Sequence, residues 1–333
     1  MPSTVVVGGF FGDEGKGKII SYLALKDNPS IIVRGGAGPN AGHTVKDGDK
    51  IYKIRMLPSG FLNKNSKVMI GPGVVVNPKV LLKEIKDFDV SNRTYVDKHC
   101  GVIEEKHLNE DSKGTLKEKI GSTGSGTGPA NADRALRTLQ MAKDNESLSS
   151  YLEDVPKAIN SALDSNENVL VEGTQGTHLS LWHGTYPFVT SKDVTASGIC
   201  ADIGLGPKRV DEVLVVFKSY VTRVGTGPMD NELTPEETAG KGWAEVGTVT
   251  GRQRRAAEFN FDLARRSVML NSATQIAITK LDVLFPDCAK KTMYDELSDD
   301  AKSFIRNIET NLNVPVTLIG TGPSIKDVID RRK

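Results

Sequence analysis

The segment Gly12–Lys18, a glycine-rich loop near the start of the chain, constrains the fold more than any other feature of the sequence. It follows the β-branched run Thr4–Val7, which predicts a buried strand, and it leads into the helical pattern Lys16–Leu25. Glycines in such a loop let backbone N–H groups close around phosphate oxygens, and the helix N-terminus adds partial positive charge. The order of strand, glycine loop and helix therefore predicts an α/β fold with a phosphate-binding site.

The rest of the chain continues the alternation of apolar strands and amphipathic helices. Short apolar runs predict strands at Ile31–Arg34, Asn168–Val171, Val213–Phe217, Gln275–Thr279 and Val316–Ile319. Helical patterns cover Ala132–Lys143, Leu152–Leu163, Phe261–Leu270 and Ser298–Asn311. Unbroken apolar strands of this kind are typical of a mostly parallel central sheet with helices on both faces, here of a P-loop NTPase-like type. Residues 1–333 are expected to form one domain, with loop and helical subregions around 90–165 and 221–260 and with long active-site loops at Asn109–Gly128 and Val221–Gly247.

The phosphate loop departs from the usual pattern at the position that binds magnesium. Gly12, Gly17 and Lys18 fit the Walker spacing, but Ile19 stands where a serine or threonine would be expected. A Mg²⁺ ion must then find its protein ligand elsewhere. Asp13, inside the loop, is the natural candidate because Mg²⁺ prefers oxygen ligands.

A second feature indicates which nucleotide is bound. The predicted strand Gln275–Thr279 is followed at its carboxyl end by Lys280-Leu281-Asp282. A carboxylate at this point can accept hydrogen bonds from both N1–H and N2–H of guanine, which adenine cannot offer, while the lysine stem packs on the base. In a phosphate-loop protein this arrangement favours GTP over ATP.

Composition argues against other classes of partner. Lys+Arg 43 against Asp+Glu 42 gives a net charge of +1, so nothing in the charge balance indicates nucleic acid or a membrane surface. Arg252, Arg254 and Arg255 form a basic cluster without interleaved aromatic residues, which favours a small-molecule site over a nucleic-acid patch. The sequence shows neither a cationic leader nor an apolar run approaching the roughly 20 residues that span a bilayer, so we expect a cytoplasmic protein.

Several further motifs, in a fixed order along the chain, resemble those of the adenylosuccinate synthetase family. Beside the phosphate loop they are Asn40–Thr44, Gly121–Pro129 with Arg137, Glu172–Gly176, His183–Thr190, Thr248–Arg255 and Gly320–Pro323. The resemblance covers nearly the whole chain, whose length is similar to that of the compact archaeal members. The family joins L-aspartate to IMP with GTP and Mg²⁺. The products are adenylosuccinate, GDP and phosphate, formed through 6-phosphoryl-IMP in the first committed step of AMP biosynthesis.

The resemblance implies four catalytic residues, Asp13, His43, Lys16 and Gln175, and a backbone metal ligand at Gly42. Asp13 would remove the N1 proton of IMP and bind Mg²⁺, and the carbonyl of Gly42 would complete part of the metal shell. His43 would hydrogen-bond the bridging oxygen of GTP and stabilise the departing GDP. Lys16 would neutralise charge on the transferred phosphoryl group, and Gln175 would hydrogen-bond the purine amide.

The resemblance also implies three sets of binding residues and a homodimer. GTP would be bound by Gly12, Glu14, Gly15, Lys16, Gly17, Lys18, Gly42, His43, Thr44, Arg254, Lys280, Leu281, Asp282, Gly320, Thr321 and Gly322. IMP would be bound by Asp13, Asn40, Ala41, Thr123, Gln175, Thr190, Arg252 and, reaching across a dimer interface to the IMP phosphate, Arg137. Aspartate would be bound by Thr248, Val249, Thr250, Gly251, Arg252 and Arg254, whose guanidinium groups can hold carboxylates in bidentate pairs.

The sequence departs from the family pattern at three places. Val249 replaces a threonine of the aspartate loop and so removes one hydroxyl contact. Ala256–Phe259 replaces a Gly-Trp pair, which affects local packing. Phe10 and Phe11 stand where many members have Gln-Trp, leaving one polar group fewer near the nucleotide.

Two other functions are consistent with parts of the sequence. A related ligase could join aspartate to a guanine nucleotide, dGMP, but such relatives are expected to lack the loop aspartate, so Asp13 favours IMP. A GTP-binding regulatory switch would need only the phosphate loop and Thr279–Asp282. The absence of a serine or threonine at Ile19 and the presence of motifs for a second purine pocket argue against a switch.

Overall fold

A ten-stranded sheet forms the centre of the molecule. The structure is a computed structural model that describes residues 3–113, 120–247, 251 and 253–332. The strand order of the sheet is β16-β15-β14-β11-β1-β10-β2-β5-β7-β9, and every pairing is parallel except that of β15 with β16. The strands are β1 (Ser3–Gly8), β2 (Ile31–Arg34), β5 (Lys67–Ile70), β7 (Thr94–Asp97), β9 (Leu152–Glu153), β10 (Val169–Glu172), β11 (Glu212–Lys218), β14 (Gln275–Thr279), β15 (Val316–Gly320) and β16 (Val328–Asp330). The predicted α/β fold with a mostly parallel sheet is confirmed.

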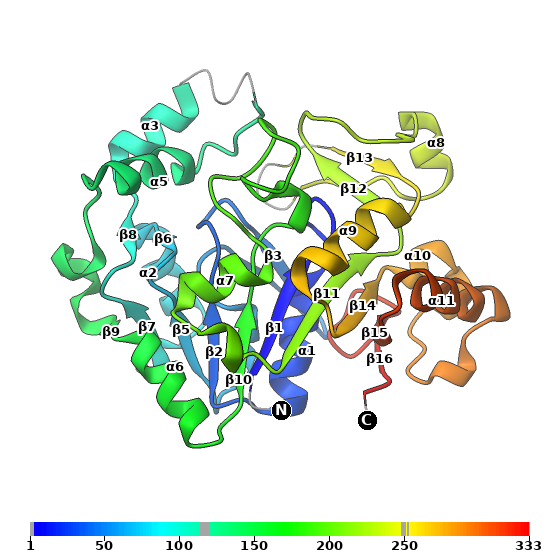
Figure 1. Cartoon of the computed structure of the whole chain (residues 1–333), viewed down its shortest axis with the longest axis horizontal. Helices are drawn as coiled ribbons and strands as arrows, with labels where there is room; N and C mark the ends of the chain where they lie inside the picture. The colour runs from blue at the N-terminus through cyan, green and yellow to red at the C-terminus, as the bar shows by residue number, and fades with distance from the viewer. Residues whose placement is uncertain (1–2, 114–119, 248–250, 252, 333) are drawn as a thin grey trace.

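In the part of the chain that the structure describes, helices and three small two-stranded sheets surround this core (Figure 1). The helices are α1 (Lys16–Asp27), α2 (Pro78–Asp87), α3 (Glu105–Lys113), α5 (Thr127–Leu136), α6 (Val155–Asp164), α7 (Ala196–Ile203), α8 (Pro235–Gly240), α9 (Phe261–Asn271), α10 (Leu281–Leu284) and α11 (Asp299–Leu312). The small sheets pair β3 (His43–Asp47) with β4 (Lys50–Ile54), β6 (Val75–Val76) with β8 (Gly101–Val102), and β12 (Val221–Val224) with β13 (Arg254–Ala257). Among the described residues, no helix is both long and apolar enough to cross a membrane.

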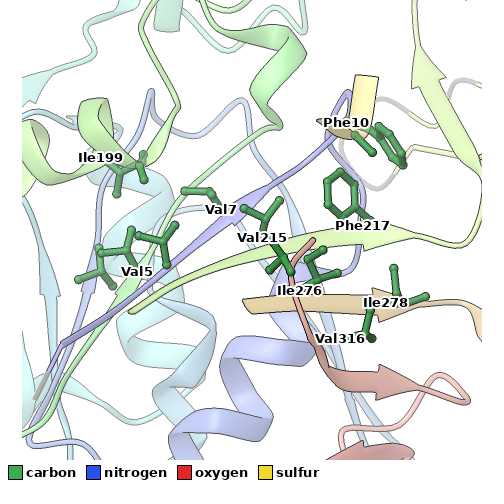
Figure 2. Close-up of a cluster of buried hydrophobic side chains, with 14 of the residues drawn as sticks. Val5, Val7, Phe10, Ile199, Val215, Phe217, Ile276, Ile278 and Val316 are labelled. Carbon is green, nitrogen blue, oxygen red and sulfur yellow. The ribbon is translucent and has the colours of Figure 1, made fainter. Parts of the chain in front are cut away.

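Strand β1 shows why the sheet is covered on both faces. Successive side chains of a strand point to opposite faces, and Val5, Val6 and Val7 are all fully buried. Val5 and Val7 belong to the same cluster as Ile199 of α7 (Figure 2). This cluster also contains residues of α6, α9 and α11. Val6 belongs instead to the cluster formed with Ile19 and other residues of α1. The run of three valines thus places one layer of helices on each side of the sheet.

Two predicted helices have different boundaries in the structure. The pattern at Ala132–Lys143 is wrong in its second half, because α5 ends at Leu136 where Arg137 takes a left-handed backbone conformation with φ 65°. The pattern at Leu152–Leu163 begins too early. Residues 152–153 form β9, and Asp154 caps the start of α6 by accepting a hydrogen bond from the Lys157 N–H at 3.1 Å.

The predicted long loops and the two peripheral subregions contain more regular structure than expected. Residues 109–113 complete α3, and residues 221–247 contain β12 and α8. The subregion around 90–165, expected to be loop and helix, also supplies the sheet strands β7 and β9. In Figure 1, α3 and α5 lie above one end of the sheet, and β12, β13 and α8 lie above the other. These two groups therefore flank the region beyond the carboxyl ends of the central strands.

Candidate active site

A large cavity opens beyond the carboxyl ends of β1, β10 and β14, where ligands bind in parallel α/β sheets. Its volume is about 1240 Å³. Most of the predicted site residues among the described ranges line it, namely Gly12, Asp13, Gly15, Lys16, Gly17, Lys18, Asn40, Ala41, Gly42, His43, Thr44, Thr123, Gln175, Thr190, Arg254, Lys280, Asp282 and Gly322. Segments that are far apart in sequence are therefore brought to one place.

The remaining predicted site residues do not line this cavity. Glu14, Leu281, Gly320 and Thr321 are buried behind its wall, and Arg137 and Gly251 are exposed. Thr248, Val249, Thr250 and Arg252 lie outside the described residues, so most of the predicted aspartate-binding loop is not described.

The side chain of Glu14 forms hydrogen bonds within the phosphate loop itself. Its Oε1 accepts hydrogen bonds from the N–H groups of Phe10 and Gly12 at 3.0 and 2.9 Å. Its Oε2 lies 2.6 Å from Lys16 Nζ, which also donates to the Gln175 carbonyl. The carboxylate thus orders the loop from behind and holds Lys16. Its direct contact with GTP stays a prediction.

Lys18 connects the phosphate loop to the C-terminal part of the chain. Its Nζ donates to the carbonyl oxygens of Gly322 and Asp327, each at 2.6 Å. Burial lowers the pKa of the Lys18 ammonium to about 8. The predicted GTP residue Gly322 is thereby fixed beside the loop although more than three hundred positions separate the two residues.

Asp13 lies at the cavity in a backbone conformation that few residues adopt. Its φ is 61°, in the left-handed region, and its side chain is 25% exposed. Arg254 Nε lies 3.0 Å from Asp13 Oδ2, but the alignment is too poor for a hydrogen bond. The Asp13 carboxylate is therefore balanced by Arg254 through an ion pair without a hydrogen bond.

His43 is held from behind by a buried carboxylate at the end of β10. Glu172 is fully buried and accepts hydrogen bonds from Ser59 N at 2.6 Å and Ser59 Oγ at 2.7 Å. His43 Nδ1 pairs with the same carboxylate and lies 2.9 Å from Ser59 Oγ. Because Nδ1 is engaged, Nε2 is the ring nitrogen that remains for a ligand.

The charges around this pair favour ionised Glu172. Burial opposes ionisation, but His43, Arg34 and the Ser59 hydrogen bond together hold the pKa of Glu172 below its usual range. Burial lowers the pKa of His43, and the Glu172 carboxylate counteracts this shift. The result is a carboxylate–imidazole pair with a fixed ring orientation.

Three of the predicted IMP residues form one hydrogen-bonded chain. Gln175 Nε2 donates to Asn40 Oδ1 at 3.1 Å, and Asn40 Nδ2 donates to Thr190 Oγ1 at 3.2 Å. Gln175 has a φ of 53°, so its backbone turns sharply after β10. The chain orients amide and hydroxyl groups along one wall of the cavity.

The opposite wall carries the residues predicted to bind guanine. Asp282 lines the cavity, and its Oδ1 is buried without a hydrogen-bond partner among the residues that the structure describes. Burial raises the pKa of Asp282 above its usual range. Such an unpaired buried acceptor is costly unless a ligand supplies the donor. Thr279 Oγ1 donates to the Glu14 carbonyl at 2.6 Å and so joins this wall to the phosphate loop.

Sequence reasoning missed the residues that support the site from behind. Glu172 ends a buried strand, and a carboxylate at that position is a signal that could have been used. Ser59 and Glu245 have no comparable local signal, because their partners are distant in the sequence. The departures Phe10 and Phe259 pack against each other with ring centroids 5.3 Å apart, so the two altered segments form one apolar contact.

The fold and the cavity together define a phosphate-loop α/β enzyme that binds a nucleotide. The family model of adenylosuccinate synthetase matches residues 5–144 and 137–287. The adenylosuccinate synthetase of Methanocaldococcus jannaschii is 58% identical, with 99% of this chain and 96% of the relative covered. That of Methanococcus maripaludis strain C5 is 56% identical over the full length of both chains. This chain therefore belongs to the adenylosuccinate synthetase family, which confirms the expected GTP-binding ligase of purine biosynthesis.

Solved structures agree with this assignment. The fully ligated adenylosuccinate synthetase of Plasmodium falciparum is 28% identical with a TM-score of 0.91, and 99% of each chain is covered. The succinoaminodeoxyadenylate synthetase of cyanophage S-2L, bound to dGMP and to dATP as an energy donor, is 26% identical with a TM-score of 0.83. The latter comparison covers 100% of this chain and 96% of the phage protein.

Proposed function

We propose that this chain joins L-aspartate to IMP at the expense of GTP, forming adenylosuccinate, GDP and phosphate. The observation that carries the proposal is the single cavity that Asp13, the Asn40–Gln175–Thr190 chain and Asp282 share. A purine amide has polar partners on one wall, a guanine has an unpaired acceptor on the other, and the phosphate loop lies between them. A cavity of about 1240 Å³ has room for two nucleotides and an amino acid together.

In the proposed reaction, each group of the chain acts at a named atom. Asp13 takes the N1 proton of IMP, so that O6 attacks the γ-phosphorus and the bond to the β,γ-bridging oxygen breaks. His43 stabilises the departing GDP through Nε2, while Lys16 and the loop amides neutralise the transferred group. The amine of aspartate then forms a bond to C6, the C6–O6 bond breaks, and one proton of the amine is released to solvent. Phosphate leaves with the original O6.

The residues around Asp13 fit a magnesium ion. A cation already lies on the Asp13 carboxylate, since Arg254 Nε is 3.0 Å from Oδ2. Mg²⁺ usually takes one or two carboxylates and completes its shell with water and substrate phosphates. Asp13 and the backbone of Gly42, which both line the cavity, would hold it there. When bound, Mg²⁺ would supply charge stabilisation to the phosphates.

A specific observation bears on the choice between IMP and dGMP. The phage relative described above was solved with dGMP, and it is 26% identical to this chain. Relatives described as adenylosuccinate synthetases are 51–58% identical. In addition, Asp13 is present and faces the cavity, as a base for the N1 proton requires. Both points support IMP as the substrate.

A product assay tests this proposal directly. Purified protein is incubated with aspartate, GTP and Mg²⁺, together with either IMP or dGMP, and the products are separated by chromatography. We expect adenylosuccinate from IMP and no succinylated product from dGMP. The reverse preference would establish the alternative ligase. GTP hydrolysis without either nucleotide and without IMP binding in a calorimetric titration would indicate a regulatory switch.

We further propose that the enzyme acts as a homodimer in which Arg137 reaches the IMP phosphate of the partner. Arg137 follows α5 in a left-handed conformation, is exposed, and does not line its own cavity, which supports a role outside its own chain.

Mixing two inactive variants tests this arrangement. Arg137→Ala and Asp13→Asn should each be nearly inactive alone, but a mixed dimer keeps one complete site. We expect mixing, after subunit exchange, to restore about one quarter of the wild-type rate, because half of the dimers are mixed and each has one intact site of two. A monomeric protein, or no recovery after exchange, would contradict the shared site.

A further inference from the structure

The side chain of Glu245 is the meeting point of four donors from three parts of the chain. Its Oε2 lies 2.9 Å from Lys218 Nζ and also pairs with Arg254 Nη1. Its Oε1 accepts from the Tyr220 hydroxyl and lies 3.2 Å from Lys280 Nζ. The backbone takes part as well, since Arg254 N donates to the Glu245 carbonyl at 2.8 Å.

The charges at this point are strongly coupled. Lys218 is 2% exposed and Glu245 12% exposed, so neither is well screened by water. Burial opposes ionisation of Glu245, but Lys218, Lys280, Arg254 and the Tyr220 hydroxyl hold its pKa well below the usual range. Loss of this one carboxylate would leave a buried ammonium on Lys218 and remove the counter-ion of two further cations.

Two cationic partners of Glu245 are predicted to contact substrates: Lys280 is predicted to contact GTP, and Arg254 is predicted to contact both GTP and aspartate. Lys280 precedes Asp282, the unpaired acceptor on the guanine wall. Arg254 contacts Asp13 of the phosphate loop and closes the segment predicted to bind aspartate. Val246 and Gln253 pair across the base of that segment in an antiparallel bridge, directly after Glu245. One carboxylate therefore joins the guanine wall, the phosphate loop and the base of the aspartate segment.

We infer that Glu245 is a positioning residue that couples the binding of GTP to the binding of aspartate. The inference rests on the proposed function. In this proposal, the guanine of GTP contacts Lys280 and a carboxylate of aspartate contacts Arg254. Both cations have Glu245 as their counter-ion. When a ligand fixes the position of one of these cations, the Glu245 carboxylate is fixed as well. The carboxylate then holds the second cation in position for its own ligand. Because such coupling is reciprocal, aspartate should strengthen GTP binding by the same factor.

Calorimetry on the full chain with IMP present tests the coupling. Aspartate is titrated with and without a non-hydrolysable GTP analogue. We expect the analogue to strengthen aspartate binding in the wild type by at least about 5-fold. In Glu245→Gln, an isosteric change, this factor should fall to less than about 2-fold, while the affinity for IMP is unchanged. Tyr220→Phe, which leaves the charges in place, should reduce the factor to an intermediate value and serves if the first variant does not fold.

Glu232→Gln is the matched control. Glu232 pairs with Arg255, the residue next to Arg254, through both carboxylate oxygens, but does not line the cavity. It should keep the wild-type coupling.

Three results would overturn the inference: no coupling in the wild type, wild-type coupling in Glu245→Gln, or an equal loss of affinity for all three substrates. A wild-type protein that binds neither IMP nor aspartate would instead refute the proposed function.

Discussion

Replacing Asp13 by asparagine is expected to lower the rate of adenylosuccinate formation by at least about 10⁴-fold, because one side chain provides both the base and a metal ligand. Removal of a general base alone typically costs about 10²- to 10⁴-fold. Asparagine is the appropriate replacement, since it tolerates the left-handed backbone conformation of residue 13, whose φ is 61°. The loop should therefore keep its shape. The loss should appear in kcat, with the affinity for IMP within a few-fold of wild type.

Asp89→Asn is the control for this variant. Asp89 also has a left-handed backbone, with φ 53°, but it is exposed and does not line the cavity. Its replacement should leave the rate unchanged. If Asp13→Asn turned over within about tenfold of wild type, Asp13 could not be the base, because the acceptor of the N1 proton would be missing.

Replacing Glu172 by glutamine is expected to lower kcat by about 10²- to 10⁴-fold although Glu172 is fully buried and does not line the cavity. The carboxylate pairs with His43 Nδ1 and fixes which ring nitrogen faces the cavity. A neutral amide can donate to Nδ1 as well as accept from it, so it no longer specifies the ring's tautomer or stabilises its positive charge. The KM values for IMP and aspartate should change much less than kcat. Steady-state kinetics with each substrate varied in turn measures the changes in kcat and in KM separately.

Glu84→Gln separates an effect on catalysis from a loss of stability. Glu84 is also a buried carboxylate, and it accepts hydrogen bonds from the N–H groups of Arg55, Met56 and Leu57 at 2.6–3.0 Å. Its replacement should lower the melting temperature while leaving kcat near wild type. Equal effects of the two variants on kcat would show that Glu172 acts only through the stability of the fold.

The parts of the fold that could be predicted are those whose signal is local. Thr4–Val7, the phosphate loop and α1 are contiguous, and each β1 valine is buried because both faces of the sheet are covered. Strands β5 and β7 were missed because each has four residues with polar side chains at its ends, Lys67 in one case and Thr94 and Asp97 in the other. The end of α5 was missed because Arg137, unlike glycine, gives no sign of a left-handed conformation.

The site residues also divide into those with a local sequence signal, which were predicted, and those without one, which were not. Residues inside motifs, such as Asn40, His43 and Gln175, were predicted and do line the cavity. Their supports were not, since Glu172 reaches Ser59 across 113 positions and no local pattern encodes that distance. Glu14 has a role that the resemblance did not indicate, because its carboxylate accepts hydrogen bonds from the loop amides, while its predicted contact with GTP stays a prediction.

The central claim is that O6 of IMP is phosphorylated before aspartate replaces it. The most direct test is the product assay run with IMP that carries ¹⁸O at position 6, followed by mass spectrometry of the inorganic phosphate. We predict that the label appears in phosphate in a one-to-one ratio with adenylosuccinate formed, because the C6–O6 bond breaks while O6 is bonded to phosphorus. Unlabelled phosphate formed together with adenylosuccinate would contradict the account.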